Sequence, residues 1–234
     1  MPANRFFYPG PLVQDETIQL TEAEHHHLRV MRIETGEEVE IINGKGALAT
    51  ATLIEMQKHS ASCQIVEVVQ HPSPKRQCAL VIPLMRPSKL EWIVEKATEL
   101  GADVLSFYAA DFSEKIQLSS NQLERLHNLC LSALKQSGRL YLPMIEEFPS
   151  LQRAMIEEAT YYFGDTTGDG ISLLKAPCGP HRTALITGPE RGFSPKELEL
   201  LARSAQGVSL SAHILRAETA PIAGISLLAL KNLT

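Results

Sequence analysis

The pattern of apolar and polar positions along the chain changes near residue 70. From residue 38 to residue 69, apolar and polar side chains alternate in short segments (39–42, 51–54 and 63–66), which is typical of half-buried strands. Asn43 and Gly44 follow the first segment, and this dipeptide predicts a two-residue hairpin turn because both residues tolerate positive φ. Residues 22–31 have the pattern of a short helix. We therefore expect a small, β-rich N-terminal domain.

A polar segment with two prolines, residues 71–75, interrupts the pattern. Prolines restrict their own backbone and that of the preceding residue, which favours an extended connector. Beyond it, segments of helical periodicity alternate with apolar runs of strand length at 79–84, 104–108, 161–163, 183–187 and 208–210. That alternation predicts an α/β fold with a largely parallel sheet. The expected domains are residues 1–72 and residues 73–234.

Two helix starts in the second domain have Ser followed three residues later by Glu, the pattern of a capping box. One pair is Ser88 and Glu91, after which apolar residues recur at helical spacing until Gly101 ends the helix. The other pair is Ser194 and Glu197, with a proline at the first helical position. This second helix is expected to begin directly after a glycine-containing loop.

The last predicted helix, at about residues 219–230, is apolar on almost every side. A helix of this kind must be covered on all its faces. A second subunit is the expected cover, so a homodimer is the expected assembly.

Composition narrows the class of protein. The 234 residues include 44% apolar and 21% charged residues, which is ordinary for a folded chain with a substantial core. No apolar run is long enough to span a membrane and no signal peptide is recognised, so we expect a cytoplasmic protein without a membrane partner. Cys63, Cys78, Cys130 and Cys178 are scattered without a CxxC pair, which argues against a zinc ribbon and a disulfide framework.

Charge is distributed unevenly along the chain. Residues 1–70 hold five Lys or Arg and ten Asp or Glu, whereas residues 71–234 hold seventeen of each kind. Neither part has the broad basic surface of a protein that binds nucleic acid by phosphate neutralisation alone. If RNA is the substrate, a local basic patch must bind it.

Candidate chemistry concentrates in two loops that flank the last predicted strand. One loop reads GPERG from Gly188 to Gly192 and leads into a helix. The other, residues 213–220, contains Arg216 and Glu218 ahead of the last helix. Backbone N–H groups at a helix N-terminus bind polar or anionic ligand atoms, so the pair can form a cofactor pocket.

Each loop also has a purely structural interpretation. The glycine loop matches neither the P-loop nor the dinucleotide fingerprint, and an ordinary tight turn explains it equally well. For the other loop, the alternative is an ion pair between Arg216 and Glu218, with Thr219 capping the last helix.

Other clusters favour no metal or nucleophile. The run from Glu24 to His27 contains three consecutive histidines, which point in different directions on a helix, so a solvated or RNA-facing surface is the better interpretation. Residues 165–170 lack the alternating ligands of a calcium loop. No pattern indicates an activated Ser or Cys. We expect no metal.

At the two C-terminal loops, the sequence resembles the SPOUT methyltransferases and, within them, the bacterial small-subunit (16S) ribosomal RNA uridine-N3 methyltransferases. The resemblance covers nearly the whole chain. The loops resemble the family motifs GPEGGFS and LGxRILRTETA. The earlier landmarks are Arg5-Phe6-Phe7, Glu24 to Leu28, Val30-Met31-Arg32, Lys96 to Gly101 and Gln136 to Arg139.

This resemblance implies an RNA-binding PUA-like β-barrel at residues 1–72, followed at residues 73–234 by a SPOUT-type α/β domain with a C-terminal trefoil knot. It implies S-adenosyl-L-methionine as the cofactor and an active site across a homodimer interface. It also implies small-subunit ribosomal RNA as the partner and methylation of N3 of a specific uridine in the decoding region as the reaction.

By position in the motifs, the resemblance assigns the cofactor to both loops. The residues are Thr187, Gly188, Pro189, Glu190, Gly192, Leu210, Ile214, Leu215, Arg216, Thr219 and Ala220. Four positions depart from the family pattern: Arg191 and Ser211 stand where glycine is usual, His213 replaces an arginine and Ala217 replaces a threonine. If position 191 needs positive φ, a side chain there costs about 1 kcal/mol.

Methylation of uracil N3 requires loss of the imide proton, so a base or a stabilising cation must act. We hypothesise that Arg216 supplies the positive field and that Glu218 is the base. The candidate RNA contacts, for which ordinary surface charge is an equal alternative, are Arg5, His25, His26, Arg29, Arg32, Arg125, Lys135, Gln136 and Arg139. Two other functions stay open: a SPOUT-like enzyme that methylates another RNA position or a protein, and a non-catalytic RNA-binding adaptor.

Overall fold

The computed structural model describes residues 4–114, 116–155, 158–168 and 170–232, and the chain forms two compact units. The first unit comprises the chain up to Ser73 together with residues 134–142. The second unit comprises residues 74–133 and 143–234. The chain therefore contributes to the first unit twice, the second time through a segment that begins within a helix of the second unit.

The first unit is built on a five-stranded sheet with the order β1-β3-β4-β5-β2. The strands are β1 (Arg5–Phe7), β2 (Thr17–Thr21), β3 (Glu38–Ile42), β4 (Ala47–Met56) and β5 (Ser60–Gln70). Strand β2 buries every second residue, as the alternating pattern predicts. Helix α1 (Glu22–Met31) adds Leu28 to a core that includes Val39, Ile41 and Leu53 of the sheet. The expected β-rich unit with one short helix is confirmed.

The turn between β3 and β4 differs from the two-residue turn that we expected. Residues 43–46 separate the strands, and Gly44 and Gly46 have positive φ of 69° and 89°. Asn43 instead accepts hydrogen bonds through Oδ1 from the N–H groups of Lys45 (2.8 Å) and Ala47 (3.1 Å). The asparagine side chain thus closes a longer turn by bonding its own following backbone.

The second unit contains a seven-stranded sheet with the order β10-β12-β9-β11-β6-β7-β8, in which neighbouring strands are parallel. The predicted parallel α/β fold is confirmed. The strands are β6 (Gln77–Pro83), β7 (Val104–Tyr108), β8 (Met144–Phe148), β9 (Thr160–Gly164), β10 (Ile171–Ser172), β11 (Arg182–Ile186) and β12 (Gln206–Ser209). The edge strands β8 and β10 were not predicted. Both are at most half-buried, so they lack the continuous apolar run that identifies a central strand.

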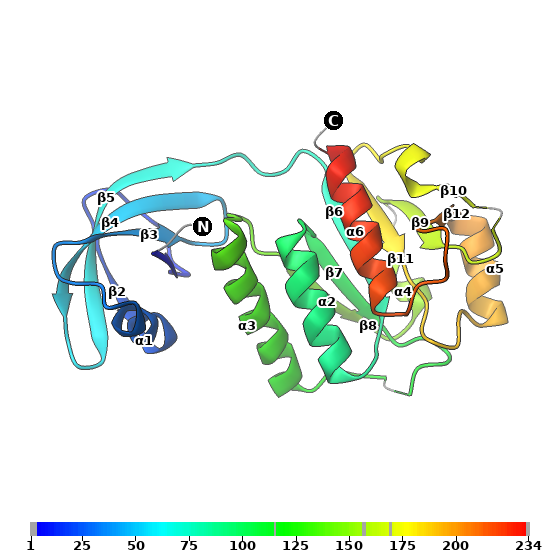
Figure 1. Cartoon of the computed structure of the whole chain (residues 1–234), viewed down its shortest axis with the longest axis horizontal. Helices are drawn as coiled ribbons and strands as arrows, with labels where there is room; N and C mark the ends of the chain where they lie inside the picture. Colours follow the sequence, from blue (N-terminus) through cyan, green and yellow to red (C-terminus); the bar gives the residue numbers. More distant parts are fainter. Residues whose placement is uncertain (1–3, 115, 156–157, 169, 233–234) are drawn as a thin grey trace. The chain divides into compact units, whose positions relative to one another are not determined.

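Helices cover both faces of this sheet. They are α2 (Pro87–Glu99), α3 (Ser120–Ser137), α4 (Leu151–Ala154), α5 (Pro195–Ser204) and α6 (Thr219–Asn232), with the short 3-10 helix η1 (Leu173–Lys175). Helix α6 packs against α2, β6, β11 and η1, and it lies beside α2 in front of the sheet in Figure 1. Helices α4 and α5 contact each other, and α5 also contacts β12.

Alternate residues of the central strands point to opposite helical layers. Ala184 and Ile186 of β11 share a core cluster with Leu151 of α4 and Leu201 of α5. Leu185 points the other way, where a β-carbon on Gly224 of α6 would lie 1.8 Å from its Cδ2 atom. Gly224 therefore allows α6 to approach the sheet closely.

The capping box predicted at Ser88 is wrong. Helix α2 begins at Pro87, and Arg86 is its N-cap, without a side-chain capping bond. Ser88 already lies in the first helical turn. A proline at the first helical position is favourable because its missing N–H would have no partner there, and this preference decides the start.

Candidate cofactor site and active site

Two loops follow β11 and β12 at the same edge of the parallel sheet. We call residues 187–194 the first loop and residues 210–218 the second loop. In a parallel sheet the carboxyl ends of the strands lie at one edge, where α/β proteins bind ligands. Strand β9 lies between β11 and β12. Leu210 of the second loop lies 3.5 Å from the β-carbon position of Gly164, at the end of β9, and 3.8 Å from that of Gly224 in α6.

The first loop is held by hydrogen bonds at both ends. The N–H of Thr187 donates to the carbonyl of Val81 (3.0 Å), and the hydroxyl of buried Tyr108 donates to the carbonyl of Thr187 (3.0 Å). At the other end, Ser194 Oγ accepts from the N–H of Glu197 (3.2 Å), and the carboxylate of Glu197 accepts from the N–H of Ser194 (2.8 Å). This is the predicted capping box, and it fixes the start of α5.

Arg191 fits the first loop without backbone strain. Gly192 has a φ of 75°, whereas Arg191 is not among the described residues with positive φ. The N–H of Gly192 donates to the carbonyl of Pro189 (2.8 Å) and closes a tight turn. The guanidinium carbon of Arg191 lies 5.0 Å from the ring centre of Phe112, a cation–π contact. The strain considered for position 191 is therefore absent, and the side chain gains a partner.

The segment after β7, residues 109–114, contacts the first loop although no sequence pattern indicated it. Ser194 Oγ donates to Asp111 Oδ2 (2.5 Å), and the N–H of Asp111 donates to Glu197 Oε1 (3.2 Å). Phe112 lies in the same segment. Asp111 and Ser194 are 83 residues apart and meet only because the sheet places their strands near each other. No local signal in the sequence could have found this contact.

The second loop makes fewer contacts of its own. Hydrogen bonds link residues 209–213 locally. The carbonyl of Arg216 accepts from the N–H groups of Thr219 (2.9 Å) and Ala220 (3.0 Å), where α6 begins. The Arg216 side chain is exposed, and Ile214 is 82% exposed. Thr219 is thus the first residue of α6. The alternative interpretation of this loop, in which Thr219 caps the last helix, is therefore wrong on this point.

A lysine of α2 connects the two loops. Lys89 Nζ lies 2.7 Å from Glu190 Oε1 in the first loop and 2.9 Å from Glu218 Oε2 in the second loop. Hydrogen bonding to Lys89 lowers the pKa of both carboxyl groups, and hydrogen bonding to Glu190 and Glu218 raises the pKa of Lys89. Among the described residues, Glu218 therefore forms its ion pair with Lys89. The purely structural interpretation of the second loop had expected an ion pair with Arg216. All three groups are charged at neutral pH.

The sequence contained one signal for Lys89, its position in the first turn of a helix. A basic side chain in the first turn of a helix opposes the helix dipole, so it needs a compensating partner. The identity of that partner depends on two loops more than 100 positions away.

The residues at this edge fit a ligand that has an apolar ring system and several polar atoms. Thr187 Oγ1 is buried and has no hydrogen-bond partner among the described residues, although a buried hydroxyl normally has one. A ligand atom at this position would satisfy it. The second loop provides apolar surface through half-buried Leu210 and Leu215 and exposed Ile214. S-adenosyl-L-methionine has both characters, since it joins a purine ring to a charged methionine.

Several candidate RNA-binding residues are already paired within the first unit. Arg5 Nη2 lies 2.7 Å from Glu40 Oε2, and Lys135 Nζ lies 2.6 Å from Glu24 Oε1. His25 is only 7% exposed and makes a hydrogen bond of 3.0 Å with a backbone carbonyl. These side chains hold β1, α1 and the end of α3 in place.

The other candidates differ in exposure. His26, Arg29, Arg32 and Gln136 are exposed, and Arg139 is half-buried. Arg29 and Arg32 lie at the C-terminal end of α1, where cations are favourable to the helix dipole. Arg125 belongs to the second unit and pairs with Glu91 (3.0 Å).

Comparisons with known proteins agree with this geometry. Residues 71–229 match the model of an RNA methyltransferase domain, and residues 20–66 match that of an RNA methyltransferase PUA domain. A Ribosomal RNA small subunit methyltransferase E from Synechocystis is 30% identical over 228 residues, which cover 91% of this chain and 72% of that protein. The chain belongs to the ribosomal RNA small subunit methyltransferase E family. The Rickettsia conorii member is 28% identical over 234 residues, covering 97% of this chain and 95% of that protein.

Solved structures related to this methyltransferase family have the same fold. A protein from Thermotoga maritima, described as a predicted RNA methyltransferase, has a TM-score of 0.78 and 29% identity, with 98% of this chain and 99% of that chain covered. The Neisseria gonorrhoeae family member, solved bound to S-adenosyl methionine, has a TM-score of 0.86 and 24% identity, with 96% of both chains covered. The expected PUA-like domain followed by a SPOUT-type α/β domain is confirmed.

Residues 4–114, 116–155, 158–168 and 170–232 contain no group of three or more His, Cys, Asp or Glu placed to hold a metal ion. The four cysteines form no disulfide, and burial raises the pKa of the Cys63 thiol to about 11. None of the described helices combines the length and apolarity needed to cross a bilayer.

Proposed function

We propose that this protein transfers the methyl group of S-adenosyl-L-methionine to N3 of a specific uridine in the decoding region of 16S ribosomal RNA, in the cytoplasm. The observation that carries the proposal is the meeting of the first and second loops through Lys89, at the carboxyl edge of the sheet, in a chain of a ribosomal RNA methyltransferase family. The proposal includes the trefoil knot at the C-terminus that the resemblance implies.

In this proposal the cofactor lies between the loops, and the residues assigned to it from the sequence keep that role. When bound, S-adenosyl-L-methionine supplies an electrophilic methyl group on a positively charged sulfur. Thr187 Oγ1 is placed to hydrogen-bond a polar ligand atom, and half-buried Leu215 to contact the adenine ring. The negative charges of Glu190 and Glu218 are offset by Lys89, which lies between them, and Arg216 of the second loop adds a further positive charge that acts on Glu218.

The chemical step requires N3 to lose its proton as it bonds to the methyl carbon, while the carbon–sulfur bond breaks and the sulfur leaves as a thioether. Glu218 accepts the proton and Arg216 stabilises the negative charge that develops on the uracil ring. Because Lys89 lowers the pKa of Glu218, the carboxylate is always ionised near neutral pH but is a weak base. The positive field of Arg216 must therefore provide the larger share of the barrier reduction.

RNA recognition is assigned to the first unit, the PUA-like domain. Exposed His26, Arg29, Arg32 and Gln136 contact the RNA, while paired Arg5 and Lys135 and buried His25 hold the surface that carries them. N3 lies on the Watson–Crick edge, so the target uridine must be unpaired or turned out.

Charge reversal tests this assignment. The double variant Arg29→Glu/Arg32→Glu should weaken RNA binding and reduce the slope of its salt dependence by about two phosphate contacts. Its affinity for S-adenosyl-L-methionine should match that of the wild type. Unchanged RNA affinity would remove α1 from the recognition surface.

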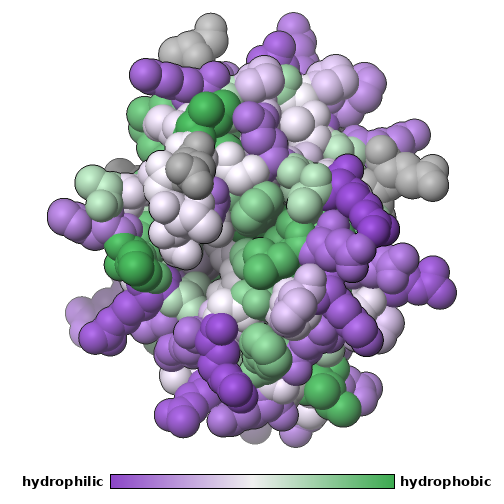
Figure 2. Space-filling view, turned by 90° about the vertical axis from the view of Figure 1, so that its right-hand side faces the viewer, coloured by the Kyte–Doolittle hydropathy of each residue, from purple (hydrophilic) through white to green (hydrophobic). Residues whose placement is uncertain are grey.

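We also propose that the protein is a homodimer. Helix α6 buries Pro221, Gly224, Ile225 and Leu228 but leaves Leu230 55% exposed. Ile171, Leu174, Leu198 and Ile214 of the same unit are also exposed. Figure 2 shows apolar side chains gathered in the middle of the face that carries α5 and β10, with polar side chains around them. Light scattering should give twice the mass of one chain, and a monomer would overturn this part.

A mass-spectrometric map of ribosomal RNA from cells with and without the protein tests the reaction itself. N3-methyluridine should be present in 16S RNA only when the protein is present, and it should stop reverse transcription because the methyl group blocks base pairing. A mark at another position would identify a different target. Failure of the purified protein to bind S-adenosyl-L-methionine would favour the RNA-binding adaptor.

A further inference from the structure

The first turn of α2 contains a cation where the electrostatics of a helix favour an anion. Lys89 lies in that turn, which contains no acidic residue. Because the N-terminal end of a helix carries partial positive charge, a lysine there is unfavourable unless other groups compensate. Here the compensation comes from outside the helix, from Glu190 at 2.7 Å and Glu218 at 2.9 Å. A residue that opposes its local preference in this way indicates a role set by the tertiary structure.

The two partners of Lys89 belong to the two loops on which the cofactor site depends. Glu190 lies at the tight turn of the first loop, and Glu218 lies two residues after Arg216, directly before α6. The three side chains are 28%, 53% and 20% exposed, in the order Lys89, Glu190 and Glu218. Ion pairs this accessible contribute little to global stability. Their effect is therefore local, on the separation of the loops.

We propose that Lys89 is a positioning residue for methyl transfer, which holds the first and second loops at the separation that S-adenosyl-L-methionine requires. The distances from Lys89 to Glu190 and Glu218 show that it connects the loops. Its role in cofactor binding rests on the proposed function. Lys89 acts through the two carboxylates and needs no contact with the reacting atoms.

Removing the lysine charge has a defined consequence. Lys89 lies between the carboxylates of Glu190 and Glu218. Without its charge, these two carboxylates repel each other. The first loop is restrained by its capping box and by Tyr108, so it stays in place. In the described part of the chain, the second loop is otherwise held by local hydrogen bonds, by Leu210 and by the start of α6, so it is the loop that moves.

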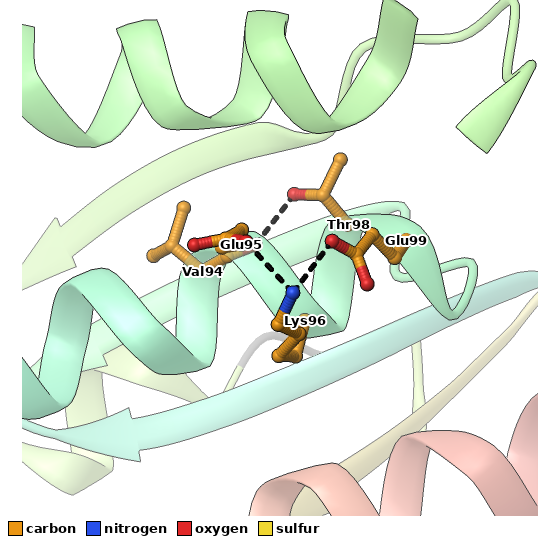
Figure 3. Close-up of polar contacts among 5 residues, drawn as sticks. All are labelled: Val94, Glu95, Lys96, Thr98 and Glu99. Carbon is orange, nitrogen blue, oxygen red and sulfur yellow. Dashed lines mark hydrogen bonds and ion pairs between the residues drawn. The ribbon is translucent and has the colours of Figure 1, made fainter. Parts of the chain in front are cut away.

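Lys96 provides a matched control on the same helix. Its Nζ lies 2.7 Å from Glu95 Oε1 and 2.8 Å from Glu99 Oε1, so it also bridges two carboxylates (Figure 3). Both partners belong to α2, and Figure 3 shows all three side chains on this helix. At 35% its exposure is similar to that of Lys89. Lys96→Met thus removes an equivalent pair of contacts without affecting either loop.

The experiment compares the wild type with Lys89→Met, Lys89→Arg and Lys96→Met by hydrogen–deuterium exchange of the full-length protein without ligand. In Lys89→Met, backbone amides of residues 210–220 should exchange faster, those of residues 187–194 should change less, and the rest of the chain should match the wild type. Lys89→Arg, which keeps the charge, should restore most of the protection. Lys96→Met should leave both loops unchanged.

Calorimetry with S-adenosyl-L-methionine gives the second readout. The Kd of Lys89→Met should rise about threefold to tenfold, the range expected for two partly exposed ion pairs, and its KM for the cofactor should rise more than its kcat falls. Equal exchange and equal Kd in the wild type and Lys89→Met would overturn the inference and leave the proposed function intact. A similar loosening of the loops in Lys96→Met would also overturn it. A wild type that binds no S-adenosyl-L-methionine overturns the proposed function, while the exchange data still decide whether Lys89 connects the loops.

Discussion

The first and second loops serve one site but are held in different ways. The first loop is fixed by the capping box at Ser194, by Asp111 and by the buried Tyr108 hydroxyl. The second loop exposes Ile214 and the Arg216 side chain and is placed from outside, by Lys89 and by α6. A site of this kind has one preformed wall and one adjustable wall. Variants in the first loop should therefore change stability, and variants in the second loop should change activity.

The largest expected effect belongs to the adjustable wall. Arg216→Ala should lower kcat on the order of a hundredfold, because it removes the cation that stabilises the developing uracil anion. The free energy of unfolding should change by less than about 0.5 kcal/mol, since the side chain is exposed. Single-turnover methyl transfer measures the first quantity and urea denaturation the second. Arg216→Lys should recover part of the rate; a rate for Arg216→Ala within twofold of wild type would make Arg216 an ordinary surface charge.

A change in the support of the second loop should affect stability as well. Gly224→Val places a side chain where the β-carbon alone would lie 1.8 Å from Leu185 Cδ2, and Leu185 is fully buried. Overpacking of this kind costs about 1–3 kcal/mol, more than the roughly 0.4 kcal/mol by which helix propensity favours Val over Gly. Urea denaturation should show the loss. The control is Ala223→Val at the half-buried neighbouring position, and equal stability of the two variants would contradict the close approach of α6.

The preformed wall predicts a smaller change. Ser194→Ala should reduce the free energy of unfolding by about 1–2 kcal/mol, because it removes the capping bond at the start of α5 and the hydrogen bond that the Ser194 hydroxyl donates to Asp111. Ser88→Ala is the matched comparison, since Ser88 has the same sequence pattern but lies inside the first turn of α2. Its effect should stay within about 0.5 kcal/mol. Equal loss of stability in the two variants would contradict the assignment of Ser194 as a helix cap and of Ser88 as an ordinary residue of the first turn.

The smallest effect is the response of the loop connection to pH. The pKa values of Glu190 and Glu218 are lowered from 4.5, so their pairing is fully formed above that pH and is lost as pH falls through the lowered values. The pKa of Lys89 is raised from 10.5, so its contribution is present below that pH and is lost as pH rises through the raised value. Protection of the second loop, corrected for intrinsic exchange rates, should be constant between about pH 5 and 10. A transition near neutral pH would contradict this account of the loop connection.

Local sequence patterns predicted much of the fold and part of the site. Continuous apolar runs identified β6, β7, β9, β11 and β12, and the Ser194 box located the start of α5. The same reasoning missed the edge strands β8 and β10, because half-buried strands show no continuous run. It also misplaced the start of α2, because two favourable signals, a serine box and a proline, competed within one turn.

The sequence by itself determined which segments become strands and helices, since that choice depends on side-chain periodicity and on caps only a few residues long. The two C-terminal motifs also indicated the family, because a motif is recognised from its residues without knowledge of their tertiary contacts. Only the tertiary structure decided that Glu218 pairs with Lys89, that Arg191 packs on Phe112 and that Asp111 meets Ser194. These contacts join residues far apart in the chain, and the order of parallel strands, which no local pattern encodes, is what brings them together.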